Sequence, residues 1–514
     1  MPKLSKAKPQ ASNTTQRVVK SSFYNSLAMA INKFGALIFT ILVARMLFPE
    51  LFGLYSIALT FILIAVSFID YGINATMVRY LAEVLKKKSV KAEIEARSKF
   101  FFLLNFKVIL TGILALVIFA LADILAVYLF NKPLLTLPLR LSAIYLFLLS
   151  IHAFWTSIFY LMQRVNYSVM AETIFQVLRI VLVAIIFLFY KTVDAVFIAL
   201  IIAVLISFMY LYLISIKKYG FLFRGKRIKL EKNEKKKLIS FSAWLTISSF
   251  TLIFFTHVDL FMLGIFLPAE FPGFYNAIIS LVIAVAVLVG FGFVLLPVFA
   301  QLEQGRLERG FSKVFRYVNL VAIPASIGLA YISTSVIKAI YGAAYVPTEY
   351  RLAIIFTSAL LSLLVAEIAL TSIFSSLFQS REKHKIPAIL IIIAIITNII
   401  LNYIFIRLGL TIAPQYCLVG VALATLLTRY GNLIALASIA KKKFNIKLQI
   451  NALIKTLIAS ALMLGFLMLT DYLIVLNILA GILLVITAII VYIAIMFVIK
   501  GIKREDFELI KLLH

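Results

Sequence analysis

The sequence predicts an all-α membrane protein that crosses the bilayer about fourteen times, and three observations lead to that fold class. Of its 514 residues, 63% are hydrophobic and 14% are charged, and the mean hydropathy is +1.08. Soluble domains are only about 45–50% apolar. The apolar residues form long runs without the period-two alternation of outer-membrane barrel strands, so each run predicts a helix. Spans of roughly 20 apolar residues each would use up this content in about fourteen crossings.

The predicted spans follow one another with short connections. In chain order they are residues 21–47, 54–82, 99–122, 139–162, 169–190, 194–216, 238–266, 273–300, 313–337, 351–378, 387–406, 416–439, 452–470 and 474–499. The first run is too long for the core of a signal peptide and lacks a cleavage pattern, so we expect it to remain as the first span.

The distribution of charge predicts the orientation. The chain has 50 Lys and Arg against 21 Asp and Glu, a net charge of +29. If the N-terminus is cytoplasmic, the interior segments hold 37 of the Lys and Arg residues and the exterior loops hold six. Because cytoplasmic loops are enriched in Lys and Arg, this split predicts that both termini are cytoplasmic. The most basic segment, 217–237, is expected to attract anionic membrane lipids, and no nucleic-acid partner is needed to explain it.

A repeated motif predicts the domain organisation. Residues 50–55 (ELFGLY) close the first exterior turn, and residues 270–275 (EFPGFY) do the same 220 residues later. Six predicted spans separate the copies, so both halves have the same orientation, as in a parallel repeat of transporter lobes. We therefore expect an N-lobe at 1–216, a basic cytoplasmic linker at 217–237, a C-lobe at 238–440, and two extra spans with a cytoplasmic tail at 441–514.

The sequence gives no catalytic, metal or cofactor site. The single cysteine, Cys417, excludes a disulfide scaffold and a multi-cysteine metal site. Residues 220–227 (GFLFRGKR) approach the P-loop pattern but lack its Ser or Thr and a preceding strand, so ATP is not the expected energy source. His257 and Asp259 are two residues apart and lie on different helix faces, which argues against a His–Asp pair.

Ionisable residues within the spans are the candidate functional groups, because each costs about 2.5–3.5 kcal/mol at the centre of a membrane helix. Six are predicted near mid-membrane: Lys33, Asp70, Arg179, Asp259, Glu367 and Arg429. Six more are predicted near span ends, where their charged groups are expected to reach the interface: Arg45, Arg79, Lys107, Asp123, Glu172 and Lys455.

Two interpretations of the central six stay open. They could form ion pairs that lock helices together, Asp70 with Lys33 or Arg179, and Arg429 with Glu367 or Asp259. Alternatively they line a water-filled cavity that receives an anionic headgroup. Polar residues at helical spacing favour the cavity: Asn25, Asn32, Asn74, Thr371, Ser375, Asn398 and Asn402.

Several segments together resemble a known family. They are residues 43–55 (VARMLFPELFGLY), 69–75 (IDYGINA), 78–82 (VRYLA), 258–264 (VDLFMLG), 398–402 (NIILN) and 420–425 (GVALAT). In order and placement these resemble the polysaccharide-biosynthesis, Wzx-type flippases of lipid-linked oligosaccharides, which belong to the multidrug/oligosaccharidyl-lipid/polysaccharide exporter superfamily. The resemblance implies a V-shaped pair of six-helix lobes that alternate between inward-open and outward-open states, with two extra C-terminal helices.

The resemblance also implies a function, which is the transfer of a polyprenyl-phosphate- or polyprenyl-diphosphate-linked glycan from the cytoplasmic to the outer leaflet of the cell membrane. Cations would hold the phosphates, here Lys33, Arg179 and Arg429, with Arg45 and Arg79 near the cavity mouths and Asn25, Asn32 and Asn74 as polar neighbours. Asp70, Asp259 and Glu367 would couple transport to H⁺ or Na⁺. Membrane lipids and glycan-assembly enzymes are the expected partners. The equal number of acids and bases departs from a strongly cationic pocket.

Other function classes stay open beside this one. The nearest is a cation-coupled multidrug exporter of the same superfamily, which has twelve spans. A peptidoglycan-precursor flippase shares fourteen spans, but its sequence pattern is not evident here. A membrane-embedded glycosyltransferase, which would be an enzyme, needs carboxylates on an exterior loop, where this chain offers Glu50.

Overall fold

The protein is described here by a computed structural model. The structure describes residues 11–290, 299, 304–383, 385–473 and 478–501. Within these ranges the side chains of 11–31, 33, 71, 248, 304–306, 471–473 and 478–480 lie outside the description.

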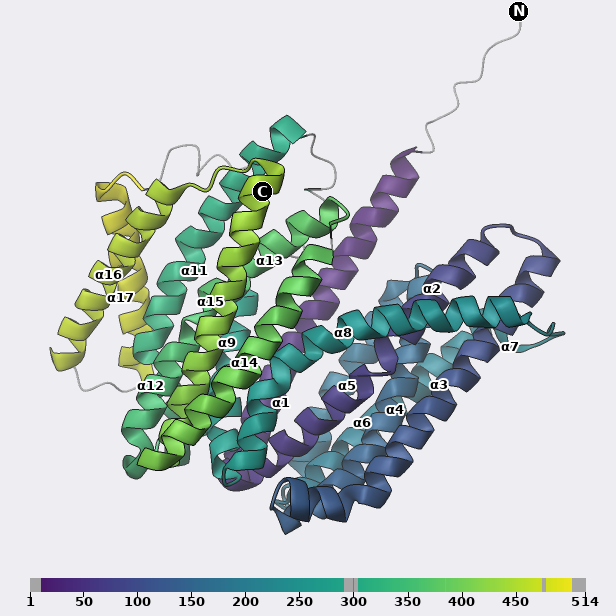
Figure 1. Cartoon of the computed structure of the whole chain (residues 1–514), viewed down its shortest axis with the longest axis horizontal. Helices are drawn as coiled ribbons and strands as arrows, with labels where there is room; N and C mark the ends of the chain where they lie inside the picture. Colours follow the sequence, from purple (N-terminus) through teal and green to yellow (C-terminus); the bar gives the residue numbers. More distant parts are fainter. Residues whose placement is uncertain (1–10, 291–298, 300–303, 384, 474–477, 502–514) are drawn as a thin grey trace, which may run out of the picture. The chain divides into compact units, whose positions relative to one another are not determined.

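Every regular element among the described residues is a helix (Figure 1). The α-helices are α1 (Ala11–Ser67), α2 (Asp70–Leu85), α3 (Val90–Ile124), α4 (Thr136–Leu161), α5 (Val165–Ile186), α6 (Val193–Lys218), α7 (Gly220–Phe223), α8 (Lys232–Phe266), α9 (Glu270–Val289), α11 (Gln304–Tyr341), α12 (Arg351–Ser362), α13 (Leu364–Ser380), α14 (Lys385–Ile412), α15 (Tyr416–Phe444), α16 (Ile450–Leu473) and α17 (Ile478–Val498). A π-helical turn (Leu125–Leu129) and 3₁₀ turns (Pro133–Leu135, Ala343–Tyr345 and Thr348–Tyr350) lie between them.

The number of membrane crossings agrees with the sequence prediction. Thirteen helical stretches of the described chain are long and apolar enough to cross a membrane. The first of them, Phe34–Leu85, has 52 residues. At 1.5 Å per residue it would extend about 78 Å, far more than the roughly 30 Å of a hydrocarbon core. The backbone leaves the helical conformation at Phe48 (φ 58°, ψ 171°), directly before Pro49, which disfavours helical geometry at the preceding residue. The stretch therefore contains two crossings, and the all-α polytopic fold with fourteen spans is confirmed.

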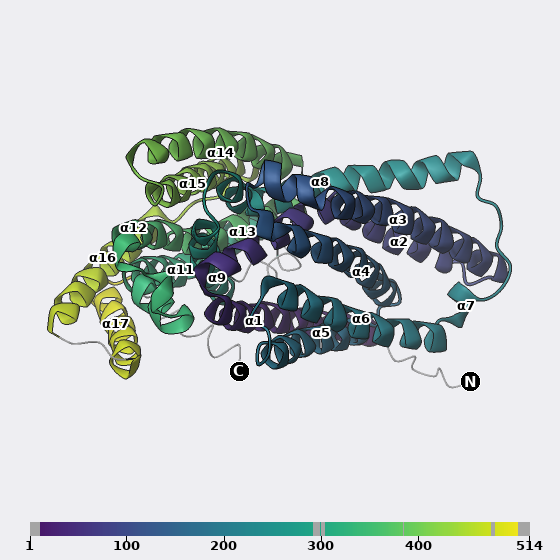
Figure 2. The same ribbon diagram turned by 90° about the horizontal axis from the view of Figure 1, so that it is seen from below.

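The chain divides into two compact units. Unit 1 contains residues 1–47 and 57–253, and unit 2 contains residues 48–56 and 254–514. In unit 1, α3, α4 and α6 run side by side (Figure 1). In unit 2, α14 packs on α15 and α16 packs on α17, as the view from below shows (Figure 2). The boundary between the units lies within α8, so this helix contributes its first part to unit 1 and its second part to unit 2. The lobe boundaries inferred from the sequence stay a prediction.

In unit 1, the basic segments gather at one end of the helices. The side chain of Arg97, near the start of α3, donates to the carbonyls of Phe221 and Lys226, both at 2.7 Å. The neighbouring Ser98 hydroxyl accepts from the Ile228 amide at 2.9 Å. Lys218 donates to the Tyr167 hydroxyl. The segments 83–99, 163–168 and 217–237, which the charge count places on the same side of the membrane, therefore meet at the same end of unit 1.

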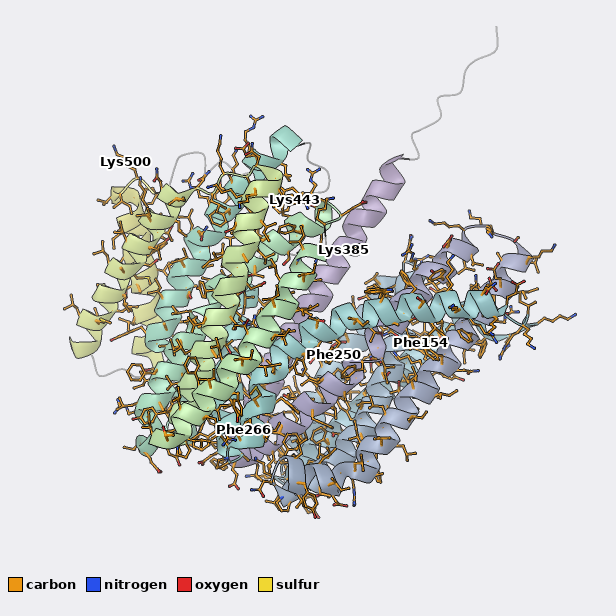
Figure 3. All side chains as sticks on the ribbon, viewed as in Figure 1. Phe154, Phe250, Phe266, Lys385, Lys443 and Lys500 are labelled. Carbon is orange, nitrogen blue, oxygen red and sulfur yellow. The ribbon has the colours of Figure 1, made fainter. Side chains whose placement is uncertain are left out.

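Unit 2 has a basic end as well. The Ser312 hydroxyl donates to the Lys447 carbonyl at 2.7 Å, and Arg316 donates to the Gly501 carbonyl at 2.9 Å. Figure 3 shows Lys385, Lys443 and Lys500 towards this end and Phe266 at the opposite end. The alternation predicted for the second half of the chain is consistent with this arrangement.

The two copies of the repeated motif contact each other within unit 2, and the contact is reciprocal. A Cβ atom on Gly53 would overlap the carbonyl of Ala269, and a Cβ atom on Gly273 would overlap the carbonyl of Pro49. One turn further on, Asn276 donates to the Ser56 hydroxyl at 2.7 Å. The second glycine contact repeats the first with the two motif copies exchanged, because each residue is replaced by the one 220 positions away. Such an exchange is expected of a self-complementary contact about a two-fold axis. The absence of a Cβ at both glycines is what allows the helices this close approach.

Alanine at either motif glycine should therefore destabilise the protein. We expect Gly53→Ala and Gly273→Ala each to cost about 1–3 kcal/mol, because a methyl group is forced against a backbone carbonyl. The measurement is the thermal unfolding midpoint of the detergent-purified protein. Gly431→Ala is the matched control, since a Cβ there has open space and should leave the midpoint unchanged or raise it. Equal midpoints for all three variants would contradict the close contact.

Candidate functional site

Unit 1 contains a buried ion pair between α2 and α3. The Nζ of Lys107 lies 2.9 Å from Asp70 Oδ1, and the Lys107 side chain is fully buried. Lys107 also donates to Asn74 Oδ1 at 2.8 Å, and the Ser150 hydroxyl donates to Asp70 Oδ1. Asp70 is the first residue of α2, where the positive end of the helix dipole favours a carboxylate. The lysine and the aspartate are thus compensated by each other and by neutral hydrogen-bonding groups.

This pair bears on two sequence-based expectations. Asp70 was expected to pair with Lys33 or Arg179, and Lys107 was expected near a span end with its amine at the interface. The structure pairs Asp70 with Lys107, a partner that the sequence analysis did not name. The expected interfacial position of Lys107 is wrong, because its side chain is fully buried on α3, which begins at Val90 rather than at residue 99. Lys107 is 17 residues into this helix, roughly 25 Å from its start, so its amine is inside the unit. The first turns of α3 are polar, which made them appear to belong to the preceding loop.

A second polar group of unit 1 joins α1 and α5. The Gln176 amide donates to Asn32 Oδ1 at 3.2 Å and to Glu172 Oε1 at 2.8 Å. The guanidinium of Arg179, one turn along α5, lies 4.5 Å from the ring centroid of Phe39 and 5.2 Å from that of Phe175. Aromatic faces attract a cation. The Glu172 carboxylate also interacts electrostatically with this guanidinium. Arg179 is half-buried and therefore brings a permanent positive charge into a membrane-spanning segment.

The other cationic and polar candidates of unit 1 are placed as follows. Arg45 and Arg79 are exposed on α1 and α2, and the Arg79 guanidinium lies 4.6 Å from the Phe241 ring centroid. Asn74 is engaged by Lys107. The side chains of Asn25 and Lys33 lie outside the described residues.

In unit 2, Asp259 is surrounded by hydrogen-bond donors from three other helices. Its Oδ2 accepts from the Tyr275 hydroxyl of α9 at 2.8 Å and from the Thr425 hydroxyl of α15 at 2.6 Å. Its Oδ1 accepts from the Asn402 amide of α14 at 2.9 Å. Asp259 is only 7% exposed, and these three donors are neutral.

The shell around Asp259 continues through α14. The Asn402 amide also donates to Asn398 Oδ1 at 3.1 Å, and Asn398 donates to Thr428 at 3.3 Å. The Oδ1 of Asn402 is buried without a hydrogen-bond partner among the described residues. The cluster therefore offers one carboxylate, amide oxygens and a hydroxyl within a small volume, and oxygen atoms of this kind are the ligands of hard cations.

A second ion pair of unit 2 connects α13 and α15. Arg429 Nη1 lies 3.7 Å from Glu367 Oε2, and the Thr371 hydroxyl donates to Glu367 Oε1 at 2.7 Å. The Arg429 guanidinium also lies 4.8 Å from the Phe255 ring centroid. Of the two partners expected for Arg429, the structure contains Glu367, whose side chain is buried. Two of the three acidic candidates, Asp70 and Glu367, thus have a cationic partner, and the shell of Asp259 consists of neutral groups.

Sequence reasoning missed several members of these clusters. Lys107 was assigned to the interface, and Ser150, Tyr275 and Thr425 were not singled out. The last two had a detectable signal, because Tyr275 ends the second copy of the repeated motif and Thr425 ends the segment 420–425. Their roles depend on how α9 and α15 are rotated about their axes, which a uniformly apolar pattern does not reveal.

Taken together, the helical spans and the compensated charges within them define a polytopic membrane protein. The model of the polysaccharide biosynthesis protein family matches residues 18–303, more than half of the sequence, and the chain belongs to that family. The resemblance inferred from the sequence is thereby confirmed. Family and fold together describe a polytopic membrane protein of the polysaccharide biosynthesis family.

Solved structures and a curated relative support the same fold. The chain is similar to the lipid II flippase MurJ in an inward closed conformation, with a TM-score of 0.75, 17% identity, and coverage of 92% of this chain and 98% of that one. It is also similar to the MATE multidrug transporter DinF-BH, with a TM-score of 0.56, 14% identity, and coverage of 87% and 100%. An uncharacterized membrane protein of Methanocaldococcus jannaschii is 21% identical over 392 residues, which are 73% of this chain and 74% of the relative.

Replacing one partner of the Asp70–Lys107 pair should destabilise the protein more than replacing both. We expect Lys107→Met or Asp70→Asn alone to destabilise the protein by about 3–5 kcal/mol, because each leaves a buried charge uncompensated. The double variant should recover part of that loss, since no charge remains. The measurement is a double-mutant cycle on the thermal unfolding midpoint. Strictly additive effects would contradict a direct interaction.

Proposed function

We propose that the protein is a flippase that moves a polyprenyl-phosphate- or polyprenyl-diphosphate-linked oligosaccharide from the cytoplasmic to the outer leaflet by alternating access. It would act in the plasma membrane with both termini in the cytoplasm, and supply surface polysaccharide or glycan assembly, whose enzymes would be its partners. The observation that carries the proposal is the permanent charge of Arg179, presented from a spanning helix of a chain that belongs to the polysaccharide biosynthesis family.

The polar groups of unit 1 suit a substrate whose headgroup would otherwise lose its hydration in the membrane. A sugar-phosphate headgroup cannot cross hydrocarbon, because its hydroxyls and charges would lose their hydration. A transporter therefore has to offer substitute polar contacts, while the lipid tail stays in the bilayer. This process forms no covalent bond, so we propose a protein that is not an enzyme and needs no cofactor.

We place the substrate phosphate at Arg179. A guanidinium pairs with two phosphate oxygens at once and stays protonated at any physiological pH. Lys33 on α1 is proposed as a second cation, with Arg45 and Arg79 as entry contacts and Asn25, Asn32 and Asn74 as polar neighbours. Arg429, which contacts Glu367, is proposed as a further cation.

We propose Asp259 as the site of the coupling ion, with Asn398, Asn402 and Thr425 as its neighbours. The residues fit a small monovalent cation, since the carboxylate contributes one negative charge and the surrounding ligands are neutral oxygens. Asp70 and Glu367 are less suitable for this role, because each is compensated by a basic side chain. A proton on Asp259 would serve the same purpose, and the experiment below distinguishes the two ions.

Replacing Arg179 should slow flipping without unfolding the protein. The assay uses liposomes with a fluorescent polyprenyl-diphosphate sugar, whose accessibility to a membrane-impermeant quencher reports the leaflet. We expect Arg179→Gln to slow flipping by about 10–100-fold, the value of a charged hydrogen bond, and Arg179→Lys to retain part of the rate. Arg140→Gln is the control, because Arg140 pairs with Asp123 at 2.5 Å on the surface.

The same assay can reject the proposal. Unchanged flipping by Arg179→Gln would remove Arg179 from the site while leaving the function intact. If the wild-type protein moves no lipid-linked sugar but exports a hydrophobic dye under a cation gradient, the chain is a multidrug exporter. The fold similarity to DinF-BH is the observation that makes this second arm necessary.

Asp259→Asn should uncouple transport from the ion. We expect the rate of the variant to be insensitive to Na⁺ and pH gradients, because the amide has nearly the same shape but lacks the charge. A wild-type rate that responds to Na⁺ at constant pH identifies sodium, and one that responds to pH alone identifies the proton. Asp123→Asn is the matched control and should respond as the wild type does. A variant that keeps its gradient dependence would exclude Asp259 as the ion site.

A further inference from the structure

An apolar groove lies between α3 and α4 of unit 1, which pack side by side (Figure 1). Its volume is about 310 Å³, and all of its lining residues are apolar. Gly112 and Ala115 are among them, and their small side leaves room between the helices. The atom nearest to a Cβ added at Gly112 would belong to the Phe147 ring, at 3.8 Å. The groove faces outward, because Leu116 and Ile144 on its walls are 68% and 42% exposed.

The groove is too narrow for a helix. Gly112 and Phe119, its first and last residues on α3, are separated by about 10 Å along the helix axis. Over that length the volume corresponds to a cross-section of about 30 Å², less than half that of a helix about 10 Å across. Both walls belong to membrane-spanning stretches, so the groove opens to the hydrocarbon of the bilayer. A single alkyl chain is the occupant that suits its width and its apolar lining.

An ion pair marks one end of the groove. Asp123 lies about one turn beyond Phe119 on α3, and its Oδ2 is 2.5 Å from Arg140 Nη2 of α4. The Arg140 guanidinium lies 5.8 Å from the Phe119 ring centroid. The basic segments of unit 1 gather near the start of α3, at the opposite end of this helix. The predicted topology therefore places the ion pair at the exterior face of the membrane.

The pair can make further polar contacts. The side chains of Asp123 and Arg140 are 59% and 38% exposed. A guanidinium has five N–H donors, and here one of them, at Nη2, donates to Asp123 Oδ2. The other carboxylate oxygen of Asp123 accepts no hydrogen bond from the part of the chain that the structure describes. Because the two charges balance, the pair suits a headgroup that carries both signs, with a phosphate at the arginine and an ammonium at the aspartate.

We propose that the groove binds one acyl chain of a zwitterionic phospholipid with a primary amine, whose phosphate contacts Arg140 and whose ammonium contacts Asp123. The apolar groove and the ion pair at its end match the two chemically different parts of such a lipid. With the predicted topology the lipid belongs to the outer leaflet. The site is separate from Arg179 and from the groups around Asp259, and it does not depend on the proposed function.

The headgroup contact is tested by native mass spectrometry of the full-length protein with phosphatidylethanolamine and with phosphatidylglycerol of the same acyl chains. We expect the wild type to bind phosphatidylethanolamine at least fivefold more tightly. Asp123→Asn removes the balancing charge and should reverse the preference to about fivefold for phosphatidylglycerol, since a cationic side chain at the surface attracts an anionic headgroup. Glu349→Gln is the matched control, because it removes an exposed acid from the 3₁₀ turn before α12, and its preference should stay within twofold of the wild type.

A second variant tests the groove itself. Gly112→Leu fills the groove with a side chain, and a helix interior favours leucine over glycine, so the fold should persist. We expect this variant to bind phosphatidylethanolamine about tenfold more weakly, because the acyl chain loses its apolar contacts. Gly465→Leu on α16 is the control. A Cβ there meets open space, so binding should stay within twofold of the wild type.

Four results would overturn the proposal. Wild-type binding by Gly112→Leu would exclude the chain from the groove, and Ala115→Leu gives the same comparison should the first variant fold poorly. An Asp123→Asn variant that still prefers phosphatidylethanolamine would exclude the ion pair as the headgroup contact. Displacement of phosphatidylethanolamine by an equal concentration of a polyprenyl phosphate would assign the groove to a transported lipid. A wild-type dimer that Gly112→Leu dissociates would assign it to a second copy of the chain.

Discussion

The cost of placing a charge in hydrocarbon is the constraint on which the interior of this protein depends. A lone ionised side chain is expensive there, so each one needs an opposite charge, a set of hydrogen-bond donors or an aromatic surface. The structure contains all three solutions. Lys107 and Asp70 neutralise each other, Asp259 accepts from three neutral donors, and Arg179 lies against two phenylalanine rings. The three solutions differ in whether the buried charge stays available to a ligand. A mutual pair is satisfied in one arrangement, whereas a carboxylate among neutral donors retains a negative charge for an incoming cation.

Much of the fold could be predicted from the sequence, because hydropathy and charge act over whole segments. The runs of apolar residues located the fourteen crossings, and the counts of Lys and Arg identified basic segments that meet at one end of each unit. The pair of Arg429 with Glu367 was among the predicted alternatives. The identity of the partners at a given depth was harder to predict. In a membrane both the lipid-facing and the buried faces of a helix are apolar, so the sequence lacks the amphipathic signal that would give its rotation. Lys107 was missed for a different reason, since its helix begins at Val90 with polar turns that resemble a loop in sequence.

The two copies of the repeated motif not only resemble each other but also contact each other. The glycine of each motif copy packs on the backbone of the other copy, and Ser56 contacts its own counterpart Asn276. A contact in which equivalent residues meet is self-complementary, so it could have formed between two identical chains before any difference between the halves arose. Function could then diverge in the rest of each half, and in the present chain the ion pairs of units 1 and 2 are built from different residues at different helices.

The segment after α6 illustrates how a joint between two halves can be held while its sequence changes. Arg97 and Ser98 hold this segment through the carbonyls of Phe221 and Lys226 and the amide of Ile228. These three bonds recognise main-chain atoms that every residue type supplies, so the side chains along the joint are open to drift, including gain or loss of the lysines that orient the chain. Position 225, in contrast, cannot accept other residue types without strain. Gly225 has a φ of 119°, and a Cβ there would collide with the Arg97 guanidinium. Among related sequences the joint should vary in composition around a glycine that stays.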